Sequence, residues 1–194
     1  MGDRILEDWL EAVVAERGLT ALRSLDDARR MLLDDVLRAV PVVERFGGTI
    51  VDVGSGTGSP GIPLAVSLPG REITLLEAER RKCDFLERWA PPNARVVWGR
   101  AEEQEPDSVG VAVAKALAPP PVAAEWCLAL VRPGGAALLF VGETAEVERV
   151  ARVSKQLGGG EPEDHAGLLV LPKLEPTPTG FPRRSGMARK RPLA

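Results

Sequence analysis

Three glycines placed directly after a short branched, apolar segment constrain this chain more than any other feature of its sequence. Residues 49–53 read T-I-V-D-V, which is typical of a buried parallel strand. Gly54, Gly56 and Gly58 follow at alternate positions, where they let the backbone turn sharply and approach a ligand with no Cβ atom in the way. A helix is expected over 61–67. A glycine-rich turn without a ligand is the alternative, but a simple connection between a strand and a helix does not need three glycines at alternate positions.

Strand and helix patterns continue to alternate along the chain at the spacing of βαβ units. Short apolar runs predict strands, and the longer stretches between them predict helices. We expect strands over 73–76, 95–98, 109–114, 136–141 and 167–171, and helices over 79–90, 121–131 and 143–157. This alternation predicts an α/β fold of the Rossmann-like type, in which a mostly parallel sheet carries helices on both faces.

Both ends of the chain lie outside this alternation. At the N-terminus, apolar residues spaced three and four apart predict a helix over 5–14, and Ser24 with Asp27 has the form of a capping box that begins a second helix. Pro41 is expected to end that helix. Residues 172–194 hold too many prolines and glycines for regular structure. The predicted organisation is an N-terminal helical extension over 1–46, a core over 47–175 and a C-terminal tail over 176–194.

The tail carries a charge opposite to that of the rest of the chain. It holds five of the 25 lysines and arginines and none of the 28 acidic residues. Its bases are Arg183, Arg184, Arg189, Lys190 and Arg191. An acidic body with a basic tail indicates an anionic partner for the tail, although a solvated terminus would have the same composition. Such side chains suit contacts to RNA phosphates, which position a protein without reading the base sequence.

Composition argues against several other classes of protein. The apolar runs are far shorter than the roughly 20 residues of a membrane-spanning helix, and the N-terminus does not fit a signal peptide. Cys83 and Cys127 are too few for a disulfide framework and are expected as core thiols, and His165 alone cannot build a histidine metal site. The tryptophans at 9, 89, 98 and 126 and Met31 are also expected in the core. We therefore expect a cytoplasmic, monomeric protein without a resident metal.

Two acidic residues favour S-adenosylmethionine over a dinucleotide at the glycine loop. Asp52 lies two residues before Gly54, where a carboxylate would repel a pyrophosphate but suits the ammonium of a methionine moiety. Glu77, at the end of the second strand, can accept both hydroxyls of a ribose. Residues 56–61 also match the dinucleotide pattern G-x-G-x-x-G. The chain, however, is too short for a second nucleotide-binding half and a substrate domain.

Longer motifs make this site part of a family resemblance. They are V-D-V-G-S-G-T-G-S-P-G-I-P-L-A at 51–65, T-L-L-E-A-E-R-R-K-C-D-F-L-E-R-W at 74–89, G-R-A-E-E at 99–103, R-P-G-G at 132–135 and F-P-R-R-S-G-M-A-R-K-R-P-L at 181–193. With them, nearly the whole chain resembles the RsmG (GidB) family of small-subunit (16S) ribosomal RNA guanine-N7 methyltransferases. The resemblance implies the class I S-adenosylmethionine-dependent methyltransferase fold, and ribosomal RNA or the small ribosomal subunit as the partner.

The resemblance also assigns the cofactor to individual residues. It places the methionine part on Gly54, Gly56 and Gly58, the ribose on Glu77, and the adenine beside Ala101 and Glu102. The five bases of the tail are assigned to RNA. Methylation of guanine N7 needs no general base, because that nitrogen has a free lone pair, so a chain without a catalytic histidine or tyrosine can perform it by alignment alone.

Three positions depart from the family pattern. Lys115 stands near cofactor and substrate where the family usually has arginine, and we expect its ammonium to contact a phosphate or the guanine carbonyl oxygen. Val141-Gly142 lacks the lysine that commonly precedes the glycine, and the segment around Gly18 lacks the usual asparagine and histidine. The alternative functions are therefore a family member altered toward another substrate, or a non-catalytic RNA-binding protein that retains a cofactor pocket.

Overall fold

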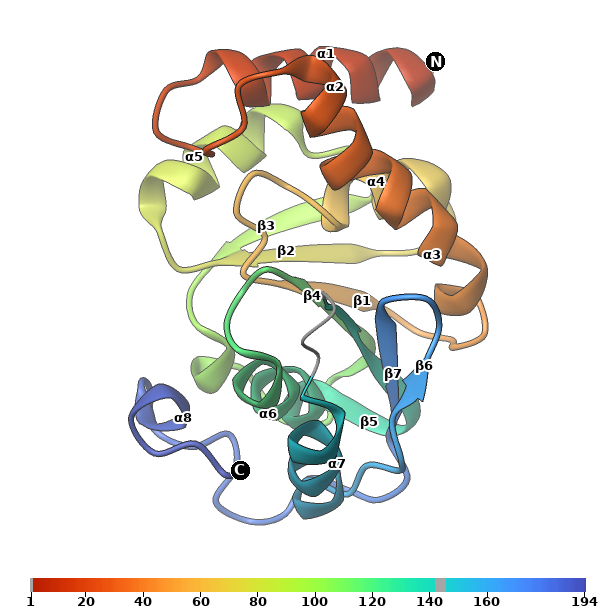
Figure 1. Cartoon of the computed structure of the whole chain (residues 1–194), viewed down its shortest axis with the longest axis vertical. Coiled ribbons are helices and arrows are strands. Elements are labelled where there is room, and N and C mark those ends of the chain that lie inside the picture. Colours follow the sequence, from red (N-terminus) through yellow and green to blue (C-terminus); the bar gives the residue numbers. More distant parts are fainter. Residues whose placement is uncertain (1, 142–145) are drawn as a thin grey trace.

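The computed structural model describes residues 2–141 and 146–194, and within them one twisted sheet lies between two layers of helices (Figure 1). The sheet has seven strands in the order β3-β2-β1-β4-β5-β7-β6. They are β1 (Ile50–Val53), β2 (Ile73–Glu77), β3 (Ala94–Trp98), β4 (Val109–Lys115), β5 (Val131–Phe140), β6 (Glu163–Asp164) and β7 (Leu168–Pro172). The first five run parallel, whereas β7 lies antiparallel to β5 and β6 antiparallel to β7. The predicted α/β fold with a mostly parallel sheet is confirmed.

Helices cover both faces of the sheet, each over its own apolar cluster. One face carries α1 (Gly2–Ala15), α2 (Leu25–Ala28), the π-helical turn η1 (Arg29–Asp34), α3 (Asp35–Val43), α4 (Gly61–Ser67) and α5 (Arg80–Trp89). The other carries the 3₁₀ turn η2 (Ala101–Glu103), α6 (Pro120–Leu130), α7 (Val147–Gln156) and α8 (Met187–Lys190). None of the helices in the described residues is long and apolar enough to cross a membrane.

β4 shows how the sheet separates the two clusters. Val111 and Val113 face the cluster under the N-terminal helices, and Ala112 and Ala114 face the cluster under α6. Successive side chains of a strand point to opposite faces, so an unbroken apolar run is buried on both sides. The small alanines let α6 approach closely, and all of its residues from 121 to 130 are buried.

The second predicted helix is present but extends further than its sequence pattern indicates. Ser24 caps it as expected, since its hydroxyl accepts a hydrogen bond from the backbone N–H of Asp27 at 3.1 Å. The prediction that Pro41 ends the helix is wrong, because Pro41 lies inside α3, which continues to Val43. A proline removes the hydrogen bond to the carbonyl four residues earlier. That carbonyl belongs to the exposed Leu37, so solvent can replace the missing donor.

Two residues expected in the core lie at the surface. Trp98 is 62% exposed at the end of edge strand β3, and Met31 is 46% exposed on η1. Trp9 and Trp126 are buried as predicted, and Trp89 is half-buried. Periodicity assigns a residue to an element, but it does not report whether another element covers that part of the surface. Both predictions failed for this reason.

The remaining elements differ from prediction mainly at their ends. β5 begins at Val131, directly after α6, and therefore starts five residues before the strand expected over 136–141. Gly142 and the predicted start of the helix over 143–157 lie outside the described residues. The tail is not irregular throughout as expected, because α8 forms within it. Burial of Ala188 against the cluster under α6 stabilises this short helix, which no local pattern predicts.

Trp9 and Trp98 should respond very differently to truncation. Trp9→Ala removes a fully buried side chain and its indole hydrogen bond to the Thr57 carbonyl, and we expect the free energy of unfolding to fall by about 3–5 kcal/mol. Trp98→Ala removes an exposed side chain and should change it by about 0.5 kcal/mol or less. Urea unfolding followed by circular dichroism measures both. Equal losses in the two variants would contradict the described packing of α1.

Candidate functional site

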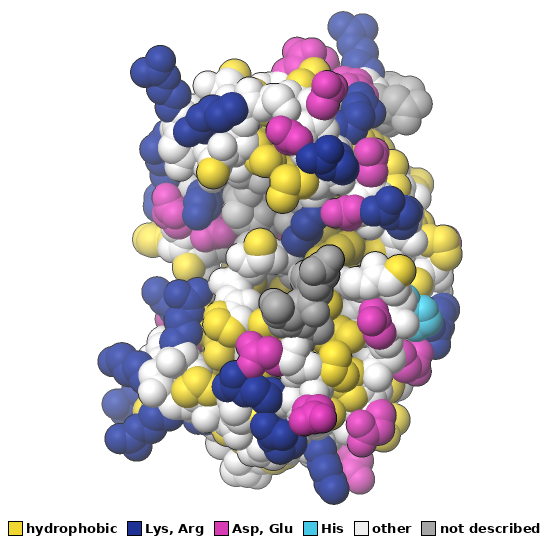
Figure 2. All heavy atoms as spheres, viewed as in Figure 1, with side chains coloured by type: hydrophobic (Ala, Val, Ile, Leu, Met, Phe, Trp, Pro, Cys, Tyr) yellow, Lys and Arg dark blue, Asp and Glu magenta, His cyan; other side chains and the backbone are white. Residues whose placement is uncertain are grey.

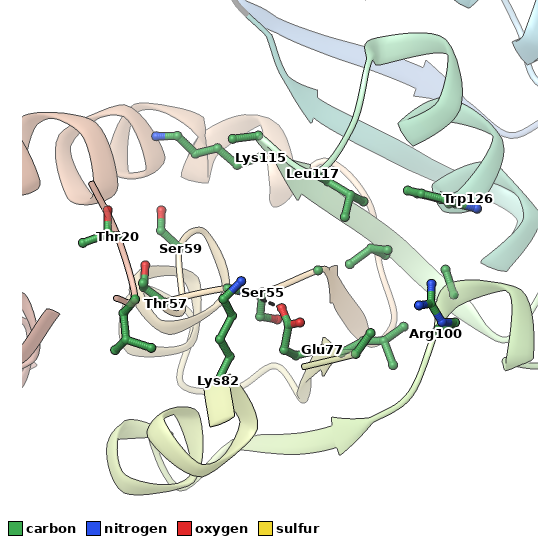
Figure 3. A pocket seen from close by; sticks show the side chains of 18 of the residues that line it. Thr20, Ser55, Thr57, Ser59, Glu77, Lys82, Arg100, Lys115, Leu117 and Trp126 are labelled. Atoms are coloured by element: carbon green, nitrogen blue, oxygen red, sulfur yellow. Dashed lines mark hydrogen bonds between the residues drawn. The ribbon is translucent and has the colours of Figure 1, made fainter. Parts of the chain in front are cut away.

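An open cavity of about 760 Å³ lies at the carboxyl ends of β1, β2 and β4 (Figure 3). The strand order reverses between β1 and β4, and open α/β sheets bind ligands at such a point. The volume is in the range of cofactor sites. The N-terminal extension, the core and the tail all contribute to the lining. It comprises residues 19–22, 31, 32, 53–57, 59, 76–78, 82, 99–102, 115–117, 126 and 189.

The glycine loop forms one wall of this cavity. Gly54 and Gly56 line it, both with positive φ, at +72° and +57°. A Cβ atom on Gly54 would collide with Cδ1 of Leu117, so a larger residue would fill the space between the loop and β4. Gly58 does not line the cavity, and a Cβ atom there would collide with Ile62 of α4. Two of the three predicted glycines therefore face the cavity, and the third keeps the loop close to α4.

Glu77 faces the same wall from the end of β2, as predicted. Its Oε2 accepts a hydrogen bond from the backbone N–H of Gly56 at 2.8 Å, and its Oε1 accepts one from the N–H of Glu79 at 2.8 Å. An ionised carboxylate offers about four acceptor positions. The two that the backbone leaves open can accept hydroxyls of a ligand in the cavity.

Asp52 lies beneath the glycine loop and outside the cavity lining. It is fully buried, and its Oδ2 accepts a hydrogen bond from the N–H of Gly61 at 2.9 Å, where α4 begins. Burial raises the pKa of Asp52 to about 7, against the opposing effect of hydrogen bonds from Gly61 and Ser55. Through this hydrogen bond, Asp52 fixes the end of the loop at the start of α4. Its contact with the ammonium of a methionine stays a prediction.

The expected adenine contacts, Ala101 and Glu102, lie together in η2 at the edge of the cavity. Ala101 is buried and contributes an apolar surface. Glu102 uses Oε1 to accept a hydrogen bond from the N–H of Gly186 at 2.9 Å. The side of the cavity predicted for adenine is therefore also the place where the tail meets the core.

The tail is docked on the core and is not the solvated terminus that its composition also allowed. Arg183 forms a bidentate ion pair with Glu125 of α6, with Nε–Oε1 and Nη2–Oε2 distances of 2.7 and 2.6 Å. Glu125 is only 3% exposed. Phe181 and Ala188 pack against the apolar cluster under α6. Arg183 therefore anchors the tail, and its guanidinium is engaged with the core instead of facing an RNA phosphate.

The other four bases of the tail divide into two groups. The guanidinium of Arg189 lies 5.3 Å from the ring centroid of Trp126, and its Nη2 donates to the carbonyl of Leu117 at 3.3 Å. Arg189 and Trp126 both line the cavity. The exposed bases are Arg184, Lys190 and Arg191, together with part of Arg189. One predicted RNA contact thus belongs to the cavity wall, and three face solvent.

Lys115 lines the cavity at the end of β4, but its ammonium is directed toward the N-terminal extension. Its Nζ donates to the carbonyl of Met31 in η1 and lies 3.6 Å from Oδ2 of Asp35. Burial lowers the pKa of Lys115, and the nearby carboxylate of Asp35 opposes that shift. Lys115 therefore connects β4 to η1 beside the cavity. Its predicted contact with substrate stays a prediction.

Sequence reasoning missed that the N-terminal extension builds a wall of the cavity and holds the glycine loop. The indole N–H of Trp9 donates to the Thr57 carbonyl at 2.8 Å, and the Ser59 hydroxyl donates to the Leu32 carbonyl at 2.8 Å. These bonds join residues 48 and 27 positions apart. No local pattern reports contacts over such separations.

Cys83 and Cys127 are buried, which confirms the expectation of core thiols. Burial raises the pKa of both thiols, so neither is a thiolate nucleophile at neutral pH. In the part of the chain that the structure describes, no three of its His, Cys, Asp and Glu residues are grouped to hold a metal ion.

The cavity, its glycine loop and the acidic residue at the end of β2 agree with the comparison to known families. The family model described as rRNA small subunit methyltransferase G (GidB) matches residues 4–159. The chain belongs to this family. It is similar to the ribosomal RNA small subunit methyltransferase G of Pelotomaculum thermopropionicum, with 35% identity over 205 residues, 95% of this chain and 82% of the relative. It is thus an S-adenosylmethionine-dependent methyltransferase, and the suspected family is confirmed.

Solved structures confirm the class I methyltransferase fold. The T. thermophilus 16S rRNA N2 G1207 methyltransferase, solved with AdoMet and guanosine, superposes with a TM-score of 0.56 at 20% identity, covering 77% of this chain and 41% of that one. A methyltransferase from Pyrococcus furiosus superposes with a TM-score of 0.57 at 16% identity, covering 89% and 98%. At these low sequence identities, the similarity supports a shared fold and says nothing about a shared substrate.

Glu77→Ala should weaken binding of S-adenosylmethionine. The substitution removes the open acceptor positions and the hold on Gly56, and we expect a loss of roughly 1.5–3 kcal/mol in calorimetry. Glu87→Ala makes the same charge change at an exposed position of α5 and should bind as the unmodified chain does. Unchanged affinity in Glu77→Ala, or tight NAD binding without a response to S-adenosylmethionine, would contradict the assignment.

Arg183→Gln should destabilise the folded chain. It leaves the buried carboxylate of Glu125 without its ion-pair partner, and breaking such a pair costs about 3–5 kcal/mol. The double variant with Glu125→Gln removes the uncompensated charge and should recover part of the loss. Arg184→Gln, at the exposed neighbouring position, is the control. Urea unfolding measures all three, and a loss no larger than that of the control would contradict the docked tail.

Proposed function

We propose that this chain transfers the methyl group of S-adenosylmethionine to N7 of a guanine in small-subunit (16S) ribosomal RNA, acting as a monomer in the cytoplasm. One observation carries the proposal. A single cavity has the glycine loop and Glu77 on one side and the N-terminal extension, with residues 19–22 and Met31, on another. This supports the binding of a base beside the cofactor. The name of the family supports the ribosomal RNA substrate.

The residues of the cavity fit the cofactor. A Cβ atom on Gly54 would collide with Cδ1 of Leu117, another residue of the lining, so glycine is required for this wall of the cavity to keep its shape. Glu77 has acceptor positions for the ribose, and Ala101 with Glu102 would lie beside the adenine. When bound, S-adenosylmethionine supplies an electrophilic methyl group on a sulfonium. The remaining tasks of the chain are to bind the guanine, to orient its N7 and to exclude water.

Methylation of guanine N7 requires no general base. The N7 lone pair is available without removal of a proton, and the described cavity lining contains no histidine. Alignment of two reacting groups can supply several kcal/mol of a barrier by itself. The hydrogen bonds that Trp9 and Ser59 make fix the wall against which that alignment occurs.

Exposed bases of the tail give the chain a surface for the RNA backbone. Lys and Arg side chains gather over α8 at the lower left of Figure 2, on an otherwise acidic molecule. Arg184, Lys190 and Arg191 are exposed there and suit phosphate contacts. Because Arg183 and Arg189 are tied to the core, these contacts would hold the RNA close to the cavity mouth.

Replacing the three exposed bases should weaken RNA binding and its salt dependence. The combined variant Arg184→Gln, Lys190→Gln and Arg191→Gln should flatten the slope of log K against log salt by up to about 2 units, at about 0.7 per phosphate of a single strand. Binding of S-adenosylmethionine should not change. The control replaces Arg4, Arg132 and Lys155, three exposed bases elsewhere. An unaltered slope would mean that the tail bases face only solvent.

Lys115→Ala tests the substrate side of the cavity. If Lys115 contacts the guanine or a phosphate during transfer, the rate should fall at least tenfold, about 1.4 kcal/mol, while cofactor affinity stays nearly unchanged. Lys115→Arg restores a charge at the position and should recover activity in part. Steady-state methyl transfer to purified small subunits measures the rate. A wild-type rate in Lys115→Ala would restrict the residue to its contacts with Met31 and Asp35.

The proposed function is tested by mapping guanine N7 methylation of small-subunit RNA at base resolution in a deletion strain and its parent. A methylated guanine present in the parent, absent in the deletion strain and restored by the wild-type gene but not by Glu77→Ala would support it. Identical maps, together with no methyl transfer by the purified chain, would contradict it and favour a non-catalytic RNA-binding protein.

A further inference from the structure

Trp98 is the most exposed of the four tryptophans. It is 62% exposed, whereas Trp9 and Trp126 are buried and Trp89 is half-buried. It is the last residue of β3, the edge strand of the sheet. A large apolar side chain in solvent is unfavourable unless it serves an interaction, and none of the roles assigned above uses it.

The indole ring is held in a fixed position although it is exposed. Its Nε1 donates to the Ala78 carbonyl at 3.1 Å, and the guanidinium carbon of Arg80 lies 5.4 Å from the ring centroid. Arg80 also pairs with Asp84 at 3.0 Å, one turn further along α5, which keeps the guanidinium in place. Trp98 is therefore a rigid aromatic ring with a cation over one of its faces.

This surface adjoins the cavity mouth. Ala78, which holds the ring, and Gly99 and Arg100, which follow it in sequence, all line the cavity. Arg100 is exposed and makes no ion pair within the described residues. Trp98 itself lies just outside the lining, so a ligand of the cavity that continues beyond its rim would pass over the ring.

The same rim leads to the tail. After Arg100 the chain enters η2, where Glu102 accepts a hydrogen bond from the N–H of Gly186 and Glu103 accepts one from the Ser185 hydroxyl at 3.2 Å. Figure 2 shows Lys and Arg side chains gathered over α8, and α5, on the other face of the sheet, carries Arg80. Bases of the tail and Arg80 thus border η2 and the cavity mouth from opposite faces of the sheet.

We propose that Trp98, flanked by Arg80 and Arg100, is a stacking platform for an unpaired base of the substrate RNA just outside the cavity mouth. An aromatic ring with arginines beside it is the combination that binds single-stranded nucleic acid, because every base has a face to stack and a phosphate to neutralise. A duplex would not offer an unstacked base. The proposal rests on the proposed function and adds a second RNA contact, at the rim of the cavity next to the place where η2 meets the tail.

The test measures binding of a short single-stranded oligoribonucleotide to the full chain. Stacking of one base corresponds to at least about a fivefold effect, so Trp98→Ala should weaken binding by that factor or more. Trp98→Phe keeps an aromatic face and should retain most of the affinity. Leu174→Ala removes a side chain that is equally exposed, at 64%, outside the cavity, and is the matched control. A duplex of the same sequence should not discriminate between these variants.

Fluorescence provides a second, independent measurement. Because Trp9 and Trp126 are buried and Trp89 is half-buried, acrylamide quenching of the unmodified chain reports mainly on Trp98, and Trp98→Phe supplies the contribution of the other three. Saturating oligoribonucleotide should protect Trp98 from the quencher. Wild-type affinity in Trp98→Ala, or undiminished quenching in the complex, would overturn the platform, as would protection by a protein partner but not by RNA.

The outcome is separable from that of the proposed function. Methyl transfer to purified small subunits by the unmodified chain, combined with wild-type binding by Trp98→Ala, would reject the platform and leave the function in place. Protection of Trp98 by RNA, without any methyl transfer, would support the platform and reject the catalytic function.

Discussion

The loop after β1 has no large side chain of its own to fix its path, and hydrogen bonds from four neighbouring elements hold it instead. Glu77 of β2 accepts from Gly56, and Asp52 of β1 accepts from Gly61. The other two bonds come from the N-terminal extension, through Trp9 and through the carbonyl that Ser59 reaches. Glycine residues leave the cavity unobstructed but leave the backbone flexible, and these hydrogen bonds fix the conformation of the loop.

This constraint gives the N-terminal extension a function beyond covering the sheet. Its helices bury one face of the sheet, and the residues between α1 and α2 reach the cavity. Any loosening of α1 would therefore displace Thr57, which lines the cavity. The link from Lys115 to the carbonyl of Met31 ties the same extension to β4. The stability of the fold and the shape of the cavity thus depend on the same contacts.

The tail forms the opposite boundary of the site. A buried carboxylate on α6 is costly unless it is paired, and Arg183 supplies the partner from 58 residues away. Once that pair is made, Arg189 reaches the cavity and the exposed bases are held near its mouth. A segment that would otherwise be a flexible basic terminus becomes a positioned surface for phosphates. In the proposed function, these bases would direct electrostatic recognition of RNA to the side of the molecule that carries the cavity.

Local sequence patterns predicted much of the fold and of the candidate site. The branched run before Gly54, the alternation of strands and helices, and the acid at Glu77 predicted the fold, the loop and the cofactor, because hydrophobic period and turn chemistry act between residues close in sequence. The resemblance added the family and placed Ala101 and Glu102 at the site. The small β6, the extent of α3 and the helix in the tail were not predicted, since their stability comes from contacts with distant elements.

Burial was decided only by the tertiary structure. Trp9 and Trp98 both fall in predicted elements. Trp9 is fully buried between α1 and α4, whereas Trp98 is exposed on the edge strand of the sheet. Arg183 and Arg184 are neighbours, yet only one meets Glu125. Lys173 has a charged side chain of the kind usually found at the surface, but it is only 1% exposed. Its ammonium donates hydrogen bonds to the carbonyls of Leu128 and Leu157. The sequence states which chemistry each side chain has, but which partner it meets depends on packing between segments that no local interaction brings together.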